Sequence, residues 1–184
     1  MSVVLILLLS AAWPAPVTPV SERWRSWPVA RIFPPLVPGH SPSGARVTYV
    51  LAGVAPETAC ASAFQPGAVR PGCRVALRAT YADSTQTFVV TAGIGVLDGP
   101  GTPVHRSGRP ATVRPAAFSG GPAARFGDRQ YVTGVVLGSG ERYVVATAAG
   151  YADGRAYRPG APVPSRLRGA ARQVATALHQ ALTR

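Results

Sequence analysis

The sequence contains no lysine and no asparagine, and its 184 residues include 19 arginines but only seven acidic side chains. Every basic side chain is therefore a guanidinium group, and the formal net charge is +12 at pH 7. The accompanying abundance of Gly, Pro, Ala and Val is typical of GC-rich codons, so the arginine excess does not by itself indicate a selected ligand. It still favours anionic neighbours such as lipid head groups, cell-wall phosphates or nucleic acid.

Dense basic clusters are also absent, because the arginines are scattered from Arg23 to Arg184. A scattered excess is typical of a solvated surface and not of a stripe that follows phosphates. Tyrosines and arginines interleave between residues 131 and 158, but core packing explains these rings equally well. Nucleic acid is therefore not the expected partner, and a secreted arginine-rich binder of anionic polymer stays an alternative.

Motifs for catalysis, metal binding or cofactor binding are missing too, so we predict no catalytic residue, no metal ligand and no cofactor. His40, His105 and His179 lie in separate segments without the i, i+4 spacing of a metal-binding helix. The segment 39–44 (GHSPSG) resembles the start of a nucleophile elbow but lacks the glycine two positions after the serine. Four aspartates, none of them paired for carboxylate catalysis, occupy turn-like contexts: Asp83, Asp98, Asp128 and Asp153.

One long segment keeps an enzyme reading open. Residues 98–129 form an irregular Gly/Pro-rich run, which is unusual in a compact domain and indicates function or mobility. The alternative hypothesis is therefore a hydrolase with its site in the 98–129 loop, around His105 and Asp128.

Residues 3–13 form an uncharged apolar run of the length of a signal-peptide core, whereas a membrane-spanning helix needs about 20 residues. We interpret residues 1–13 as a signal or a truncated membrane segment. A buried N-terminal strand of a cytosolic protein is the third possibility. Export predicts an extracytoplasmic protein, secreted or tethered to the cell membrane by its N-terminus.

The only two cysteines, Cys60 and Cys73, are separated by 12 residues. In an exported chain such a pair predicts a disulfide. A metal site or a reactive thiol is the alternative, but no histidine lies nearby and the spacing is not CxxC.

The remainder divides into a proline-rich stretch and a folded part. Eight prolines between residues 14 and 45 predict an extended linker. Residues 46–184 then form a single domain.

Alternating patterns predict two hairpins within this domain. Residues 74–81 and 88–96 alternate, with Arg78, Thr80 and Thr91 on the outward face. Residues 131–137 and 142–148 form the second hairpin. A short helix is expected over 56–64, and residues 165–184 repeat apolar side chains at helical spacing. We therefore predict an α+β fold: an antiparallel sheet covered on one face by helices.

The segments 53–60 (GVAPETAC), 72–81 (GCRVALRATY) and 149–155 (AGYADGR) resemble uncharacterised exported or membrane-anchored proteins of high-GC Gram-positive bacteria. The resemblance implies a membrane helix, a proline-rich stalk and an α+β outer domain, and it brings no activity with it. The leading hypothesis is a non-catalytic binding or assembly module at the cell envelope. Its partner would be an envelope protein or an anionic surface.

Overall fold

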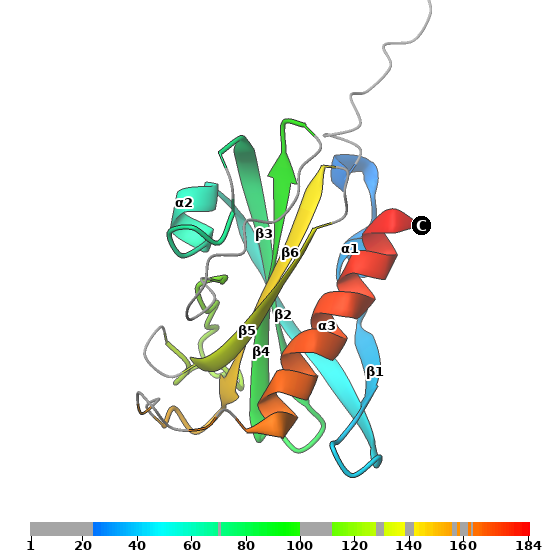
Figure 1. The fold of residues 1–184 in the computed structure, drawn as a ribbon, viewed down its shortest axis with the longest axis vertical. Helices are drawn as coiled ribbons and strands as arrows, with labels where there is room; N and C mark the ends of the chain where they lie inside the picture. The colour runs from blue at the N-terminus through cyan, green and yellow to red at the C-terminus, as the bar shows by residue number, and fades with distance from the viewer. Residues whose placement is uncertain are drawn as a thin grey trace, which may run out of the picture.

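The computed structural model describes residues 24–69, 71–99, 112–127, 131–138, 142–155, 158, 162 and 164–184. Within these residues a six-stranded antiparallel sheet packs with three helices, so the coarse α+β prediction is confirmed (Figure 1). The elements in chain order are α1 (Val29–Ile32), β1 (Leu36–His40), β2 (Arg46–Thr58), α2 (Cys60–Ala63), β3 (Cys73–Asp83), β4 (Phe88–Leu97), β5 (Tyr131–Gly138), β6 (Tyr143–Tyr151) and α3 (Ser165–Thr183).

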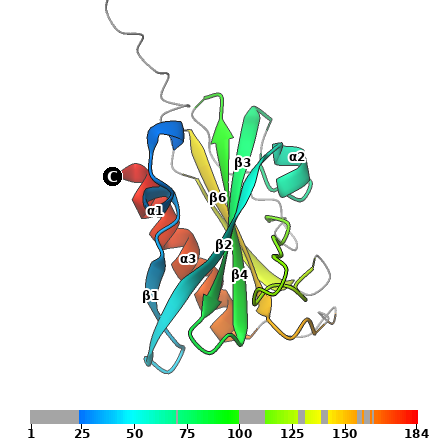
Figure 2. The same ribbon diagram turned by 180° about the vertical axis from the view of Figure 1, so that it is seen from behind.

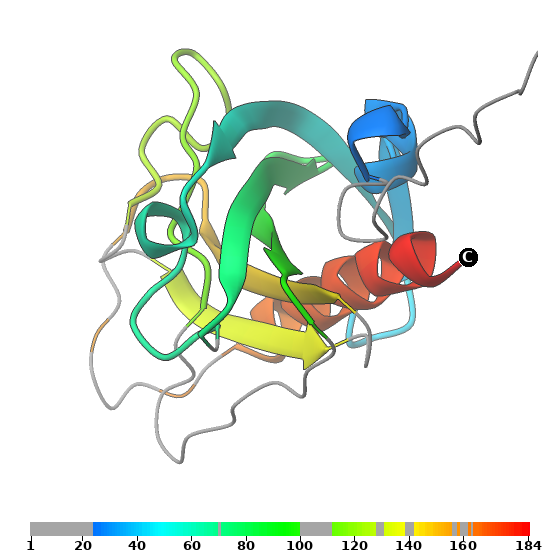
Figure 3. The same cartoon turned by 90° about the horizontal axis from the view of Figure 1, so that it is seen from above.

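The strands lie in the order β1-β2-β3-β4-β6-β5, which makes β1 and β5 the two edges. β2 carries two register irregularities, between Leu51 and Gly53 and between Ala55 and Thr58, and such irregularities bend a strand. The sheet is strongly curled when viewed from above (Figure 3). As a result α3 contacts β5 and β6 at one end of the strand order and β1 at the other.

The face of the sheet toward α3, which we call the helix face, is an apolar core. Strand residues at alternate positions, including Tyr81 and Ile94, pack there with no exposed area. The predicted stripe of α3 is confirmed, since all of its members are buried: Leu167, Ala171, Val174, Leu178 and Leu182. α1 covers the same face beside α3 (Figures 1 and 2).

The opposite face, which we call the loop face, is also covered over the strands from β3 to β6, and this corrects the prediction of a one-sided cover. α2 and the segment 112–127 lie over it (Figure 3). Thr80 and Thr91, predicted to point outward, are both completely buried. The physical reason is that polar side chains on this face bond to the backbone of the covering segment.

The predicted linker over 14–45 is wrong for its described part, residues 24–45. Trp24, Ile32, Phe33 and Val37 are buried in the helix-face core, and β1 pairs with β2 from Leu36 to His40. The physical reason is that the apolar side chains between the prolines are buried in this core. The folded domain therefore extends at least to Trp24, and the predicted signal or membrane segment, 1–13, lies outside the described residues.

A smaller difference concerns the short helix predicted over 56–64. β2 continues through the predicted start of the short helix as far as Thr58, which leaves only Cys60–Ala63 helical. Among the described residues, no helix has both the length and the apolar character needed to span a membrane.

Candidate functional site

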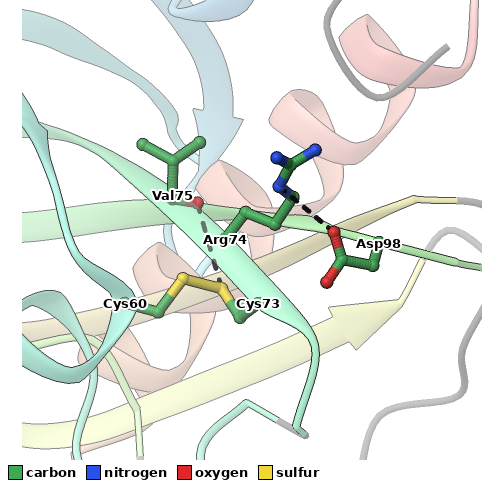
Figure 4. Close-up of a disulfide and its surroundings, with 5 residues drawn as sticks. All are labelled: Cys60, Cys73, Arg74, Val75 and Asp98. Carbon is green, nitrogen blue, oxygen red and sulfur yellow. Dashed lines mark hydrogen bonds and ion pairs between the residues drawn. A yellow bond between two sulfur atoms is a disulfide. The ribbon is translucent and has the colours of Figure 1, made fainter. Parts of the chain in front are cut away.

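The disulfide predicted between Cys60 and Cys73 is present, with the two Cα atoms 6.0 Å apart (Figure 4). Cys60 begins α2 and Cys73 begins β3, so the bond fastens α2 to the sheet. The Arg74 Nε lies 3.2 Å from a carboxylate oxygen of Asp98 beside it. This corner is structural, because both cysteines are consumed in the bond.

A second feature was not predicted: a groove of about 570 Å³ between β1 and α3. This volume lies in the range of ligand sites in proteins. One wall is the edge strand and the residues before it: Pro34, Leu36, Val37, Pro38, Gly39 and His40. The other wall comes from α3, from Arg172 onward, and from the residue after it: Arg172, Gln173, Thr176, Ala177, Gln180, Ala181 and Arg184.

The register of β1 shows which backbone groups face the groove. Ser41 donates its N–H to the carbonyl of Ala45, and Pro35 accepts from the N–H of Leu51. Backbone groups alternate in direction along an antiparallel strand, so the odd residues of β1 turn toward β2. The even residues Leu36, Pro38 and His40 therefore turn their backbone groups outward, toward the groove.

Gln173 occupies one end of this edge. Its side-chain Oε1 accepts the N–H of His40 at 2.6 Å, and its Nε2 donates to the carbonyl of His40 at 2.9 Å. The amide thus pairs with His40 as a neighbouring strand would. Gly39 makes room for it, because a Cβ at that position would collide with the Gln173 side chain and with the Tyr49 ring.

The groove is flanked by positive charge. Five exposed residues follow one another at i, i+4 spacing along α3: Arg168, Arg172, Thr176, Gln180 and Arg184. No acidic residue occurs in Ser165–Thr183, and none is found among the described residues that line the groove. The groove therefore presents backbone polar groups and guanidinium groups side by side.

The two histidines that the structure describes, His40 and His179, have separate partners. His40 ends β1, where its backbone is held by Gln173, and the His179 Nε2 lies 3.1 Å from the carbonyl of Gly138. His105 and Asp128, the residues of the hydrolase hypothesis, lie outside the described residues. The segment 39–44 comprises the last two residues of β1 and the turn that leads to β2, with Gly44 at a φ of 84°. Among the residues that the structure describes, no three His, Cys, Asp or Glu residues gather as metal ligands would.

The remaining predicted aspartates hold turns or form surface pairs. Asp83 is buried, and its carboxylate accepts the backbone N–H groups of Thr87 and Phe88, each at 2.8 Å. Asp153 lies on the surface, where hydrogen bonds from Arg155 lower the pKa of its carboxyl. These contacts explain both carboxylates by local structure.

Two buried tyrosines have hydroxyl groups with a raised pKa. Burial raises the pKa of Tyr49, against a smaller lowering by Arg166. Burial also raises the pKa of Tyr81, whose hydroxyl donates to the carbonyl of Pro34 at 3.1 Å. Both rings belong to the helix-face core, and Tyr49 also feels the nearby pair of Arg166 and Asp83.

Comparison of the chain with protein-family models, with curated proteins and with solved structures gave no match. The sequence held one signal for the groove, namely the i, i+4 series from Arg168 to Arg184 in a helix without acids. It held no signal for the strand wall, because prolines surround β1.

Proposed function

We propose that the protein is a non-catalytic binding module that acts outside the cytoplasm at the cell envelope. The observation that carries this proposal is the groove between β1 and α3. Its volume, its outward backbone groups and its flanking arginines favour a bound partner with anionic character.

The disulfide supports a location outside the cytoplasm. Structural disulfides persist in oxidising environments and are rare in reducing ones. The two cysteines, Cys60 and Cys73, are 13 positions apart in the sequence, so they do not form the redox motif CxxC. This spacing fits a structural bond. An apolar run at residues 3–13 supports export independently.

The test is fractionation of a high-GC Gram-positive host that expresses the full chain, followed by alkylation and mass spectrometry without reductant. The expected result is recovery from the membrane, cell-wall or culture fraction with both cysteines protected from alkylation. A matched control with residues 3–9 replaced by polar side chains should remain in the cytosol with both thiols alkylated. Recovery of the unaltered chain from the cytosol with reactive thiols would overturn the proposal.

A further inference from the structure

We propose that the groove binds an extended acidic segment of a partner protein, which adds a strand to the free edge of β1 and places carboxylates against Arg172 and Arg184. This inference rests on the proposed function, because it names the partner of the same surface. Three observations support it: an edge of β1 with which no described strand pairs, a helix beside that edge, and charge of one sign among the described lining residues.

The edge of β1 has unused pairing capacity. By the register of β1, the groove receives the N–H of Leu36 and the carbonyls of Leu36 and Pro38, in addition to both backbone groups of His40. In the described part of the chain, partners for this set are found at His40, where Gln173 binds. Exposed strand edges with such groups pair readily with another extended chain.

The amide of Gln173 shows that the edge accepts a partner. It makes the two hydrogen bonds that a strand residue would make opposite His40, so the geometry for pairing is already in place at this point. The same contact uses the backbone groups of His40, so that this position of the edge is already paired. An added strand would therefore occupy the portion beside Leu36 and Pro38, where the groove is open to Arg184.

The second wall of the groove defines the kind of site. An edge strand with a helix lying alongside is the arrangement into which peptides insert by strand addition, with main-chain hydrogen bonds for affinity and side-chain contacts for specificity. Leu36 is 57% exposed, which provides an apolar contact for the inserted chain. An isolated phosphate or polyphosphate would use the arginines but not the strand edge.

Charge selects the chemistry of the segment. Arg172 and Arg184 line the groove, and no described lining residue carries a negative charge. Carboxylates are the peptide groups that match guanidinium ions, through bidentate hydrogen bonds as well as charge. A basic segment would meet only repulsion.

The test is titration of the purified disulfide-bonded chain by calorimetry and amide NMR. The probe is an extended peptide of alternating glutamate and valine, acetylated and amidated, with a lysine–valine peptide as charge control. Two further peptides carry N-methyl groups, one on the glutamate amides and one on the valine amides, so that each blocks one pairing edge. We expect the glutamate peptide to bind and shift the Leu36 amide, and one methylated peptide to bind at least about tenfold more weakly.

Paired variants separate the two walls. Arg172→Glu should weaken binding by about tenfold or more, whereas Arg168→Glu, on the same helix stripe but outside the groove lining, should have a much smaller effect. Leu36→Pro removes the outward donor while Leu36→Ala keeps it, and edge strands tolerate proline where the N–H faces outward. The proline variant should therefore lose more affinity than the alanine variant, with the fold checked by its amide spectrum.

Several results would overturn the inference. These are equal binding of the two methylated and the unmethylated peptides, equal binding of the lysine peptide, or absence of binding. Binding of inorganic polyphosphate with no response to Leu36→Pro would assign the groove to anionic polymers instead. Each of these outcomes leaves the proposed envelope location to its own test, so the two proposals fail separately.

Discussion

The helices α3 and α1 cover one face of the sheet, whereas the short helix α2 and the irregular segment 112–127 cover the other. On the helix face α3 and α1 contribute apolar side chains that pack against strand residues such as Tyr81 and Ile94. On the loop face the segment 112–127 is held by polar contacts with the strands. Arg78 donates to the carbonyls of Arg114 and Pro115, each at 3.3 Å.

Two threonines extend these contacts. The Thr80 hydroxyl donates to the carbonyl of Ala116 at 2.6 Å, and the N–H of Ala116 donates to the Thr91 hydroxyl at 3.2 Å. Irregular chain leaves part of its backbone groups without a regular backbone partner, so their burial calls for side chains that bond to them. The comparison teaches that a polar side chain of a sheet can be buried when it bonds to the backbone of the covering segment. Thr80 does so on the loop face, and on the helix face Thr147 donates to the carbonyl of Ala171 in α3.

The largest expected effect tests the helix face. Leu178→Ala should lower the free energy of unfolding by about 2–5 kcal/mol, because Leu178 is completely buried and truncation leaves a cavity. Denaturant unfolding followed by circular dichroism measures the change. The control is Leu36→Ala, whose side chain is exposed and whose loss should lie within about 0.5 kcal/mol. Similar losses in both variants would contradict the assignment of this core.

The next largest effect on stability is expected from the disulfide beside the loop face. Cys60→Ala combined with Cys73→Ala should lower stability by about 3 kcal/mol, since the bond restricts the unfolded chain across a separation of 13 residues. Unfolding curves with and without reductant measure it. Reductant should shift the native chain and leave the double variant unchanged. An unshifted native chain would show that the bond adds nothing to stability.

A smaller loss is expected from the polar contacts of the loop face. Thr80→Val should lower stability by about 1–3 kcal/mol, because the buried carbonyl of Ala116 loses its donor. Hydrogen exchange should rise at Ala116 while the amides of α3 remain protected. The same substitution at the exposed Thr176 serves as the control, with little effect expected. Equal protection of Ala116 in both variants would mean that packing alone holds the segment.

The smallest effect on stability at neutral pH is expected for Tyr81 in the helix-face core, whose ionisation adds a test at high pH. Tyr81→Phe removes the hydrogen bond to Pro34, a loss of about 1 kcal/mol. Because burial raises the pKa of Tyr81 above its unfolded value of about 10, the folded state holds this proton more tightly. Stability should therefore be complete below pH 10 and fall as pH rises above it.

Unfolding measured from pH 8 to 11.5 tests this expectation. The phenylalanine variant should show a shallower decline than the native chain, with Tyr49 contributing what remains, because burial raises its pKa as well. Parallel declines in the two proteins would indicate that Tyr81 does not titrate in the unfolding transition.

The predicted and the missed parts of the fold differ in the range of the interactions that decide them. The helix at Ser165–Thr183 was predictable because its stripe from Leu167 to Leu182 follows helical spacing, a purely local property. β1 was not, because its proline at Pro38 argues for a linker until pairing is known. In the structure Pro38 stands at an outward position of an edge strand, where no N–H is required.

The candidate site follows the same rule. The arginines of α3 were visible in the sequence, but they form only one wall of the groove. The groove could not be predicted without the wall on the other side. That wall comes from residues 34–40, more than 130 positions away in the chain, and it meets α3 only because the sheet curls. The bond between Gln173 and His40 could not be derived from either segment alone.

The sequence by itself determined the local patterns: the alternation of β3 and β4, the apolar stripe of α3, the excess of guanidinium groups and the pairing of the only two cysteines. Only the tertiary structure decided that both faces of the central strands β4 and β6 are buried, that residues 36–40 form an edge strand, and that this edge lies beside α3. The reason is physical. The periodicity of apolar residues shows which side of a helix or strand is buried. Which segment covers that side depends on long-range packing and on hydrogen bonds of backbone groups, and these backbone groups are the same in every sequence.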